Sequence, residues 1–471
     1  MHQVALEVPF VEPINLFAHF QSEPHAALID CPRANEQLSR YAAIGFSPCF
    51  TIAAKNSVIR CSHPRGSETA RARGDALSAL EKHLARYRTE RLVGIPPLQC
   101  GAIGYLGYDL GHALVGIPPH PNDDIGFDDM QVAFFDRVVT FDMVTKRAWA
   151  VGMAPEGAAA TRHSDELAKT VEQIARKRRR SDVPGRKTLE PNFSRGQYET
   201  AVQRVLDYIF AGDIFQANLS QRFKVELGDL SPFELYCRLR ERTFAPFSAY
   251  VAFGDTVIAS ASPERFVRLD GRRVETRPIK GTRPRGKTAD EDASLRQALF
   301  NSEKDRAENL MIVDLMRNDL SRVCRPHSVK LTDLFAIESY ATVHHLVSTV
   351  VGELNPDLGA TDLLRATFPG GSITGAPKIR AMAILNELEP TARGPYCGIL
   401  GYFGFDGSFD SSILIRTIAI KNSLATFQVG GGVVADSTPH DEYEETLVKA
   451  MALIDALGAD DSKKLAGAAV E

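Results

Sequence analysis

The chain has 471 residues and a net charge of −4, from 55 lysines and arginines against 59 aspartates and glutamates. This balance gives no general attraction to nucleic acid or to an anionic membrane, and no apolar run is long enough to span a bilayer. Seven scattered cysteines without a CxxC pair argue against disulfides and against a zinc site. The N-terminus does not look like a signal peptide. We therefore expect a cytoplasmic protein with reduced thiols, large enough for more than one domain.

Short strands and loops are expected over residues 1–150. Residues 101–111 are glycine-rich and apolar, which is typical of strands that pack closely against another layer. They lack the strand–GxGxxG–helix context of a dinucleotide fold. A helix expected over residues 164–176 leads into a stretch rich in proline, glycine and charge. We take residues 1–180 as an N-terminal subdomain and residues 181–193 as a linker.

The second half, residues 194–458, is expected to be a domain of its own, followed by a tail of residues 459–471. Ser194 and Gln197 fit a capping box at the start of a helix. The elements expected after it are a strand at 215–223, strands within 247–280, helices within 287–321 and at 360–366 and 376–388, strands at 397–405, 411–420 and 424–434, and a last helix at about 440–457. The scarcity of βαβ repeats favours an α+β fold over a doubly wound sheet.

Lys280 lies in an unusual turn, Pro278-Ile279-Lys280-Gly281-Thr282. A hairpin turn at Asp270-Gly271 would set Glu264 opposite Arg277, with Lys280 roughly 10 Å further along an ideal strand. Strict alternation places Lys280 on the face opposite to Glu264, but a break or bulge at Pro278 could turn its amine toward that carboxyl. A surface turn with a solvated lysine is the alternative.

Two pairs of carboxylates have helical spacing, Asp305 with Glu308 and Glu442 with Glu445. Residues at i and i+3 face the same side of a helix. Mg²⁺ binds a few carboxylates and keeps waters for a substrate, so two such pairs suggest a magnesium site. Solvated helix faces are the alternative, because spacing does not show that the two helices meet.

Four further features could bind a ligand or have a purely structural role. The turn from Pro369 to Lys378 is glycine-rich and leads into a helix, whose free amides attract anions. Gly430-Gly431-Gly432 could admit a ligand close to the backbone or permit tight packing. Arg416 is a charge within an apolar segment, and a buried arginine usually pairs with a carboxylate of the protein or of a ligand. His345, beside His344, is more often a core residue than a functional one.

Six segments of the second half occur in the order typical of one enzyme family. They are Ser262-Pro263-Glu264-Arg265-Phe266, Arg277-Pro278-Ile279-Lys280-Gly281-Thr282, the helix from Asp305 to Asp319, His345-Leu346-Val347-Ser348, the turn from Pro369 to Lys378, and Glu442-Tyr443-Glu444-Glu445-Thr446. On these motifs the chain resembles the chorismate-utilising enzymes, most closely the component I group of aminodeoxychorismate synthases. The first half matches more loosely, through residues 40–48 and 104–109.

The resemblance implies a fold and a set of site residues. The family's fold is two facing antiparallel sheets in a sandwich, with helices outside and the active site in a cleft. It implies that Mg²⁺ is held by Glu308 and Glu445, with Asp305 and Glu442 nearby, and that Glu264 is the acid that helps the 4-hydroxyl of chorismate to leave. The positions that match the lining of the chorismate site are Gly281, Thr282, His345, Tyr402, Arg416, Gly431 and Lys449, with Arg416 on a substrate carboxylate.

Lys280 distinguishes the groups within this resemblance. Anthranilate synthases carry alanine in the Pro-Ile-x-Gly-Thr turn, whereas aminodeoxychorismate synthases carry lysine, which attacks ring carbon C2. Ammonia then adds at C4 to give 4-amino-4-deoxychorismate, for 4-aminobenzoate and folate synthesis. No segment looks like a glutaminase, so a separate amidotransferase subunit is implied as the ammonia source. Tryptophan binding in the N-terminal half is possible. The alternatives are anthranilate, isochorismate or salicylate synthesis, or a catalytically silent relative that senses an amino acid or acts as a scaffold.

Overall fold

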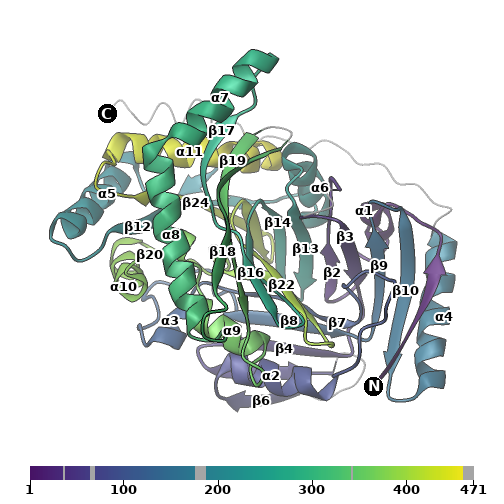
Figure 1. The fold of residues 1–471 in the computed structure, drawn as a ribbon. Coiled ribbons are helices and arrows are strands. Elements are labelled where there is room, and N and C mark those ends of the chain that lie inside the picture. The colour runs from purple at the N-terminus through teal and green to yellow at the C-terminus, as the bar shows by residue number, and fades with distance from the viewer. Residues whose placement is uncertain (35–37, 64–68, 175–186, 341–342, 460–471) are drawn as a thin grey trace.

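The computed structural model describes residues 1–471 except 35–37, 64–68, 175–186, 341–342 and 460–471. Residues 181–186 of the expected linker and residues 460–471 of the expected tail therefore lie outside the described residues. The described chain forms two twelve-stranded sheets that face each other, with helices around them (Figure 1). Every pair of neighbouring strands is antiparallel, which confirms the expected α+β sandwich.

The first sheet runs in the order β1 (His2–Val8), β10 (Arg147–Ala154), β9 (Arg137–Asp142), β3 (Tyr41–Gly45), β2 (Ala26–Ile29), β13 (Phe247–Phe253), β14 (Thr256–Ser262), β23 (Thr417–Lys421), β24 (Leu424–Val433), β12 (Gln216–Glu226) and β11 (Glu190–Pro191), with β20 (Gly375–Ala376) also paired to β12. The second runs in the order β17 (Ile279–Pro284), β19 (Val343–Glu353), β16 (Arg273–Thr276), β15 (Arg265–Asp270), β22 (Phe409–Ile413), β21 (Ile399–Gly404), β7 (Gly101–Leu106), β8 (Met130–Phe135), β4 (Phe50–Lys55), β5 (Val58–Ser62) and β6 (Thr69–Arg73), with β18 (Lys330–Ser339) paired to β19.

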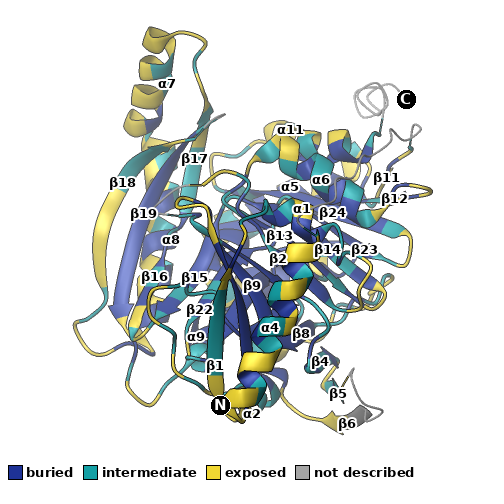
Figure 2. Ribbon diagram, turned by 90° about the vertical axis from the view of Figure 1, so that its right-hand side faces the viewer, coloured by how far each residue is buried: buried dark blue, intermediate teal, exposed yellow. Residues whose placement is uncertain are grey.

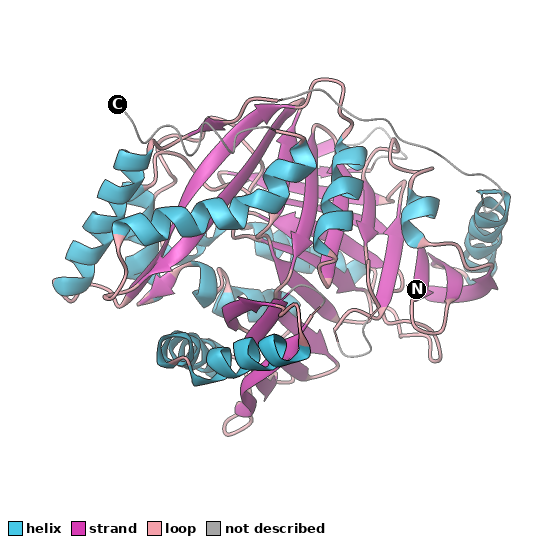
Figure 3. Ribbon diagram, turned by 90° about the horizontal axis from the view of Figure 1, so that it is seen from above, coloured by secondary structure: helices cyan, strands magenta, loops and turns pink. Residues whose placement is uncertain are grey.

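The helices lie mostly along the outer faces of the sheets (Figure 3). They are α1 (Pro13–Phe17), α2 (Ala76–Arg86), α3 (Leu110–Val115), α4 (Gly157–Ile174), α5 (Arg195–Phe210), α6 (Pro232–Thr243), α7 (Ala289–Asn301), α8 (Glu303–Ser321), α9 (Ala360–Thr367), the short 3₁₀ turn η1 (Gly371–Ile373), α10 (Lys378–Leu388) and α11 (Pro439–Leu457). Helix α4 packs on β1 and β10, α11 packs on β24, and α8 packs on β19. Helix α7 projects from the body, with most of its surface exposed (Figure 2). No helix within the described residues is long and apolar enough to cross a membrane.

The core between the sheets is apolar and is built from both halves of the chain. Side chains of the first sheet such as Val251 and Ile258 meet side chains of the second sheet such as Phe135 and Tyr105. Strands from residues 1–154 and from residues 216–433 occur in both sheets. The two expected domains thus share one sandwich, and β11, at the described end of the expected linker of residues 181–193, is itself a strand of the first sheet.

The chain crosses from one sheet to the other at two places that matter for function. Strand β14 belongs to the first sheet and β15 to the second, so the chain crosses at Pro263–Glu264. It crosses back between β22 and β23, at residues 414–416. The backbone amide of Ile413 donates to the carbonyl of Glu264 at 3.1 Å, and the amide of Ala261 donates to the carbonyl of Arg416 at 3.1 Å. The single strand expected over residues 411–420 is therefore two strands in different sheets.

Candidate active site

The hairpin before Lys280 has a register two residues away from the expected one. Arg268 pairs with Glu275 and Asp270 with Arg273, so the two-residue turn is Gly271–Arg272. Continuing this register by four residues brings Glu264 level with Ile279 instead of Arg277. Strand β16 ends at Thr276 and β17 begins at Ile279, so the expected break at Pro278 is present.

Glu264 is a buried carboxyl with few polar partners. The residue is 6% exposed, and its carboxyl accepts hydrogen bonds from the Ser372 hydroxyl at 3.1 Å and from the backbone amide of Ile279. Burial raises the pKa of Glu264 to about 7, against the opposing effects of Lys280 and of these hydrogen bonds. A carboxyl with this pKa is partly protonated near neutrality and can donate a proton to a leaving group.

The Lys280 amine lies in the same charged cluster. Burial lowers the pKa of Lys280, with a smaller contribution in the same direction from the nearby Lys449 cation, while the carboxylates of Glu308, Glu264 and Glu445 oppose the shift. A lysine whose pKa is lowered by burial and by a neighbouring cation has more of the neutral amine, which is the nucleophilic form. The structure therefore brings the expected acid and the expected nucleophile together.

Gly281 and Thr282 shape the strand next to this amine. Gly281 has φ +77° and lies at a register shift between β17 and β19. A Cβ on Gly281 would meet Cγ of Asp305 at 2.8 Å, so glycine allows both the left-handed backbone and the approach of α8. The Thr282 hydroxyl and Nδ1 of His345 are 2.9 Å apart. His345 is 4% exposed, and burial together with the Arg416 cation lowers its pKa to about 4, so the ring is neutral.

Arg416 has no carboxylate partner among the described residues. It lies where the chain crosses from β22 to β23, and its φ is +50°. Its backbone carbonyl accepts a hydrogen bond from the amide of Ala261, near the crossing between β14 and β15. Burial lowers the pKa of its guanidinium, and its charge lowers the pKa of His345, which places it next to that ring. Buried guanidinium groups normally pair with carboxylates or other anions. This one is therefore free to bind an anionic ligand.

The carboxylates of α8 and α11 approach the amines at the same cluster. Lys449 contacts Glu445 at 2.6 Å and the carbonyl of Gly430 at 2.8 Å. Burial would raise the pKa of Glu445, but Lys449, with smaller contributions from Lys280 and Lys304, lowers that pKa. Burial raises the pKa of Glu308, with Lys280 opposing, and Asp305 pairs with Arg283 at 2.9 Å.

Glu442 carries an orphan oxygen. Its Oε1 accepts from Ser437 at 2.6 Å, while Oε2 is buried and lacks a hydrogen-bond partner among the described residues. A Cβ on Gly431 would meet this Oε2 at 2.5 Å and Oε1 of Glu445 at 3.4 Å. Burial raises the pKa of Glu442, and Glu445 adds to the effect.

Across the described residues, no three His, Cys, Asp or Glu side chains are close enough to form a metal-binding group. The oxygen donors nevertheless suit the chemistry of Mg²⁺, which prefers carboxylates and retains waters.

Comparisons with known proteins show the family of the chain. A family described as chorismate binding enzyme matches residues 26–455. The chain belongs to the chorismate-binding enzyme family. It is 38% identical to aminodeoxychorismate synthase component 1 of Bacillus subtilis, covering 93% of this chain and 92% of the relative, and 36% identical to anthranilate synthase component 1 of Pseudomonas putida, covering 95% and 93%. The crystal structure of anthranilate synthase component I from Streptococcus pneumoniae is similar with a TM-score of 0.79 and 32% identity, covering 89% of this chain and 93% of the other.

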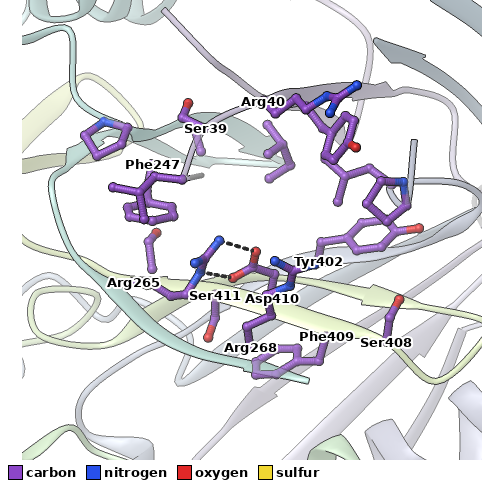
Figure 4. Close-up of a pocket in the computed structure, with 18 of the residues that line it drawn as sticks. Ser39, Arg40, Phe247, Arg265, Arg268, Tyr402, Ser408, Phe409, Asp410 and Ser411 are labelled. Atoms are coloured by element: carbon purple, nitrogen blue, oxygen red, sulfur yellow. Dashed lines mark hydrogen bonds and ion pairs between the residues drawn. The ribbon is translucent and has the colours of Figure 1, made fainter. Parts of the chain in front are cut away.

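Tyr402 is not part of the cluster around Lys280, which corrects the expectation that it lines the chorismate site. Its hydroxyl donates to the carbonyl of Gln99 at 2.8 Å, and its ring belongs to the core between the sheets. It lines a separate pocket, where Arg265 bonds Asp410 at 3.0 and 3.1 Å (Figure 4). The expected position was wrong because a tyrosine in β21 can face either side of the strand, and here it faces the core.

The pocket of Figure 4 is lined by both halves of this family member. Ile29–Asp30 and Leu38–Tyr41 contribute from the first half, and Pro246–Ala249 and Ser408–Ser412 contribute from the second. An amino-acid site confined to the N-terminal half would therefore be incomplete. Tryptophan binding stays a prediction, and this pocket is where it would be tested.

Two residues at the active site were missed by sequence reasoning. Ser372 donates to Glu264 from the turn after Pro369, a turn that was recognised without a role for its serine. Gln216 is fully buried, and neither of its amide atoms has a hydrogen-bond partner among the described residues. A Cβ on Gly432 would lie 2.3 Å from Nε2 of Gln216 and 3.6 Å from Nζ of Lys280. In the sequence, only the run Gly430-Gly431-Gly432 indicated that side chains approach the backbone closely here.

Proposed function

We propose that this chain converts chorismate and ammonia to 4-amino-4-deoxychorismate and water, with Lys280 as the covalent nucleophile. The observation that carries the proposal is the amine of Lys280, with a lowered pKa, in one cluster with the buried acid Glu264. The resemblance adds that members producing anthranilate carry alanine in place of this lysine. Both kinds of relative are similar to the chain at nearly equal identity, so the proposal rests on the lysine.

In the proposed first step, the neutral amine of Lys280 forms a bond to ring carbon C2. The ring double bonds shift, and the C4–oxygen bond breaks. Hydroxide is a poor leaving group, so Glu264 donates its proton and the group departs as water. Ser372 and the Ile279 amide hold the carboxyl in place for this transfer.

In the second step, ammonia adds at C4 while the bond between C2 and the Lys280 nitrogen breaks. The lysine leaves as an amine, and the proton that the new amino group loses returns to Glu264. Atoms and charge then balance as chorismate plus ammonia giving 4-amino-4-deoxychorismate plus water. The unpartnered amide of Gln216 lies beside Lys280, where it can hydrogen-bond ammonia or the ring substituents.

Chorismate is a dianion, so its carboxylates need cations. We assign one carboxylate to Arg416, with neutral His345 beside it to donate or accept a hydrogen bond. Glu308 and Glu445, with Asp305 and Glu442 nearby, would hold Mg²⁺. When bound, Mg²⁺ supplies positive charge that neutralises a substrate carboxylate.

A second subunit is proposed as the ammonia source. The relatives above are each named component 1 of their enzyme, which leaves room for another component. We infer that a glutaminase subunit supplies ammonia to this chain.

Identification of the product tests the proposal. The chain is incubated with chorismate, Mg²⁺ and an ammonium salt, and the products are separated by liquid chromatography before and after addition of aminodeoxychorismate lyase. We expect 4-aminobenzoate to appear only after the lyase is added. Anthranilate, isochorismate or salicylate as the product would reject the proposal in favour of that synthase, and the absence of any product would favour a silent relative.

A further inference from the structure

Three large apolar side chains are exposed together at the end of α5 and the start of α10. Phe210 is 72% exposed, Phe215 is 70% exposed and Ile379 is 56% exposed. Phe210 is the last residue of α5, Phe215 immediately precedes β12, and Ile379 is the second residue of α10. We call these three residues the 210–379 surface.

Hydrogen bonds and ion pairs hold the segments of this surface together. The backbone amide of Phe215 donates to the carbonyl of Ala376 at 2.7 Å, three residues before Ile379. Between Phe210 and Phe215, Asp213 pairs with Arg380 at 3.2 Å, so the loop is fastened to α10. The loop that leads from Phe210 to Phe215 is therefore fastened to the start of α10, which carries Ile379.

Charged side chains surround the apolar centre. The Arg380 guanidinium lies 5.3 Å from the centroid of the Tyr208 ring, and Arg204 pairs with Glu387 at 3.6 Å. An apolar centre with a polar, charged edge is the usual composition of a protein interface, and clustered exposed aromatic groups mark such sites on other proteins.

The surface also lies next to the reacting amine. Phe215 is followed by Gln216, which is fully buried. Gln216 Nε2 and Lys280 Nζ lie 2.3 and 3.6 Å from the position that a Cβ on Gly432 would take. Phe215 and Gln216 are thus consecutive residues at the beginning of β12. The first is exposed, and the amide of the second lies beside Lys280.

We propose that the 210–379 surface docks the glutaminase subunit that delivers ammonia to Lys280. This inference rests on the proposed function and adds the place of delivery. Ammonia released into water is diluted and protonated, whereas a supplier seated here would release it at the segment whose next residue, Gln216, lies beside Lys280. A second copy of this chain has no such reason to seat at this position, and self-association is an outcome that the test separates.

The test uses the full chain and the glutaminase subunit of the same organism. Two variants change the surface, the double variant Phe210→Ser with Phe215→Ser and the single variant Ile379→Ser. Phe300→Ser, at a phenylalanine of α7 that is 44% exposed, is the matched control. Binding is measured by titration calorimetry, and product formation is measured with glutamine and, separately, with ammonium salt.

We expect the double variant to weaken binding of the glutaminase about 30-fold, as for truncated aromatic residues at interface centres. Glutamine-dependent activity at limiting glutaminase should fall with it, while ammonia-dependent activity stays within about twofold of the original. Ile379→Ser should weaken binding less, and Phe300→Ser should change neither activity. Since Ile379 is not adjacent to Gln216, its variant tests the surface even if the change at Phe215 disturbs the amide.

Three results would overturn the inference. They are unchanged glutaminase binding in both surface variants, equal weakening in the Phe300→Ser control, and a self-association of the original chain that the surface variants abolish in sedimentation. The proposed function fails separately, if the original chain makes no 4-amino-4-deoxychorismate from ammonia. In that case, calorimetry of the surface variants still tests whether the glutaminase binds at the 210–379 surface.

Discussion

Two neighbouring residues, Glu264 and Arg265, belong to two very different sites. Glu264 faces the cluster with Lys280, where its carboxyl accepts hydrogen bonds from Ser372 and a backbone amide and its pKa is raised to about 7. Arg265 faces the pocket of Figure 4, where Asp410 at 3.0 Å and Glu275 at 3.2 Å satisfy its charge. The chain where β15 begins therefore contributes Glu264 to a site with unpaired charges and Arg265 to a pocket with paired charges.

The other charged groups follow the same division. At the active site, Arg416 has no carboxylate partner in the described part of the chain, and Glu442 Oε2 has no hydrogen bond there. Around the pocket, Asp30 accepts from Tyr236 at 2.7 Å and pairs with Arg240 at 2.6 Å. Buried groups are normally satisfied within the protein. In the proposed active site, the unsatisfied groups are those that we propose a charged substrate completes, whereas the charged groups named around the pocket are paired within the protein.

Replacing the nucleophile should give the largest effect. Lys280→Ala removes the amine that forms the bond to C2, so we expect ammonia-dependent kcat/KM to fall on the order of a thousandfold. Thermal unfolding monitored by circular dichroism should show a variant that is still folded, because Lys280 contributes an unfavourably buried amine. Activity retained within tenfold would mean that ammonia adds directly, as in a lysine-independent mechanism.

Glu264→Gln should lower kcat/KM by about 100-fold and change its pH dependence. Glu264 must be protonated to act as the acid, and its protonated fraction falls as the pH rises through about 7. The original enzyme should therefore lose kcat/KM on the alkaline side, with a midpoint near that value, and the glutamine variant should lack this limb. Lys280 acts in the opposite sense, since its neutral fraction grows with pH, so the acid limb should remain. An alkaline limb that persists in Glu264→Gln would assign it to another group.

Arg416→Ala should act mainly on substrate binding. Loss of the unpaired guanidinium removes the proposed partner of a chorismate carboxylate, so the KM for chorismate should rise about 30-fold, with a smaller change in kcat. Arg416→Lys should recover only part of this, because lysine lacks the planar fork of donors. Steady-state kinetics at saturating ammonium measure both. An unchanged KM would place the carboxylate elsewhere in the cluster.

Among these variants, Tyr402→Phe should have the smallest effect on the kinetics. It tests whether the pocket that contains Tyr402 is separate from the site around Lys280. The change removes the hydrogen bond to Gln99, so the free energy of unfolding should fall by about 1 kcal/mol. The KM for chorismate should stay within twofold, because Tyr402 lies in the other pocket. A tenfold rise in KM would return Tyr402 to the substrate site. Denaturant titration and steady-state kinetics provide the two readouts.

Local signals in the sequence predicted many elements well. The capping box at Ser194 and Gln197 is present with both hydrogen bonds, and the last helix begins and ends within a residue of its expected limits. Such features depend on neighbours along the chain. The hairpin before Lys280 was predicted with the wrong register, since Gly271 can occupy either position of a two-residue turn.

Contacts between distant segments were beyond the sequence patterns. Nothing in residues 411–420 indicates that Arg416 marks a crossing between sheets, and periodicity cannot tell which strands share a sheet. The approach of Glu264 to Lys280 depends on the register, the break at Pro278 and the turn carrying Ser372, all acting together. The proposed catalytic residues came from the family motifs, because the order of motifs along the chain can be recognised without knowing which segments meet in space.

The central claim is that Lys280 forms a bond to the substrate, and mass spectrometry of the trapped enzyme tests it most directly. The chain is mixed with chorismate and Mg²⁺ in the absence of ammonia, quenched, and analysed intact and after proteolysis. We predict a mass increase equal to chorismate less one water, located on the peptide that contains Lys280 and absent from Lys280→Ala. An enzyme that makes 4-amino-4-deoxychorismate from ammonia without any such adduct, or with the adduct on another residue, would contradict the account.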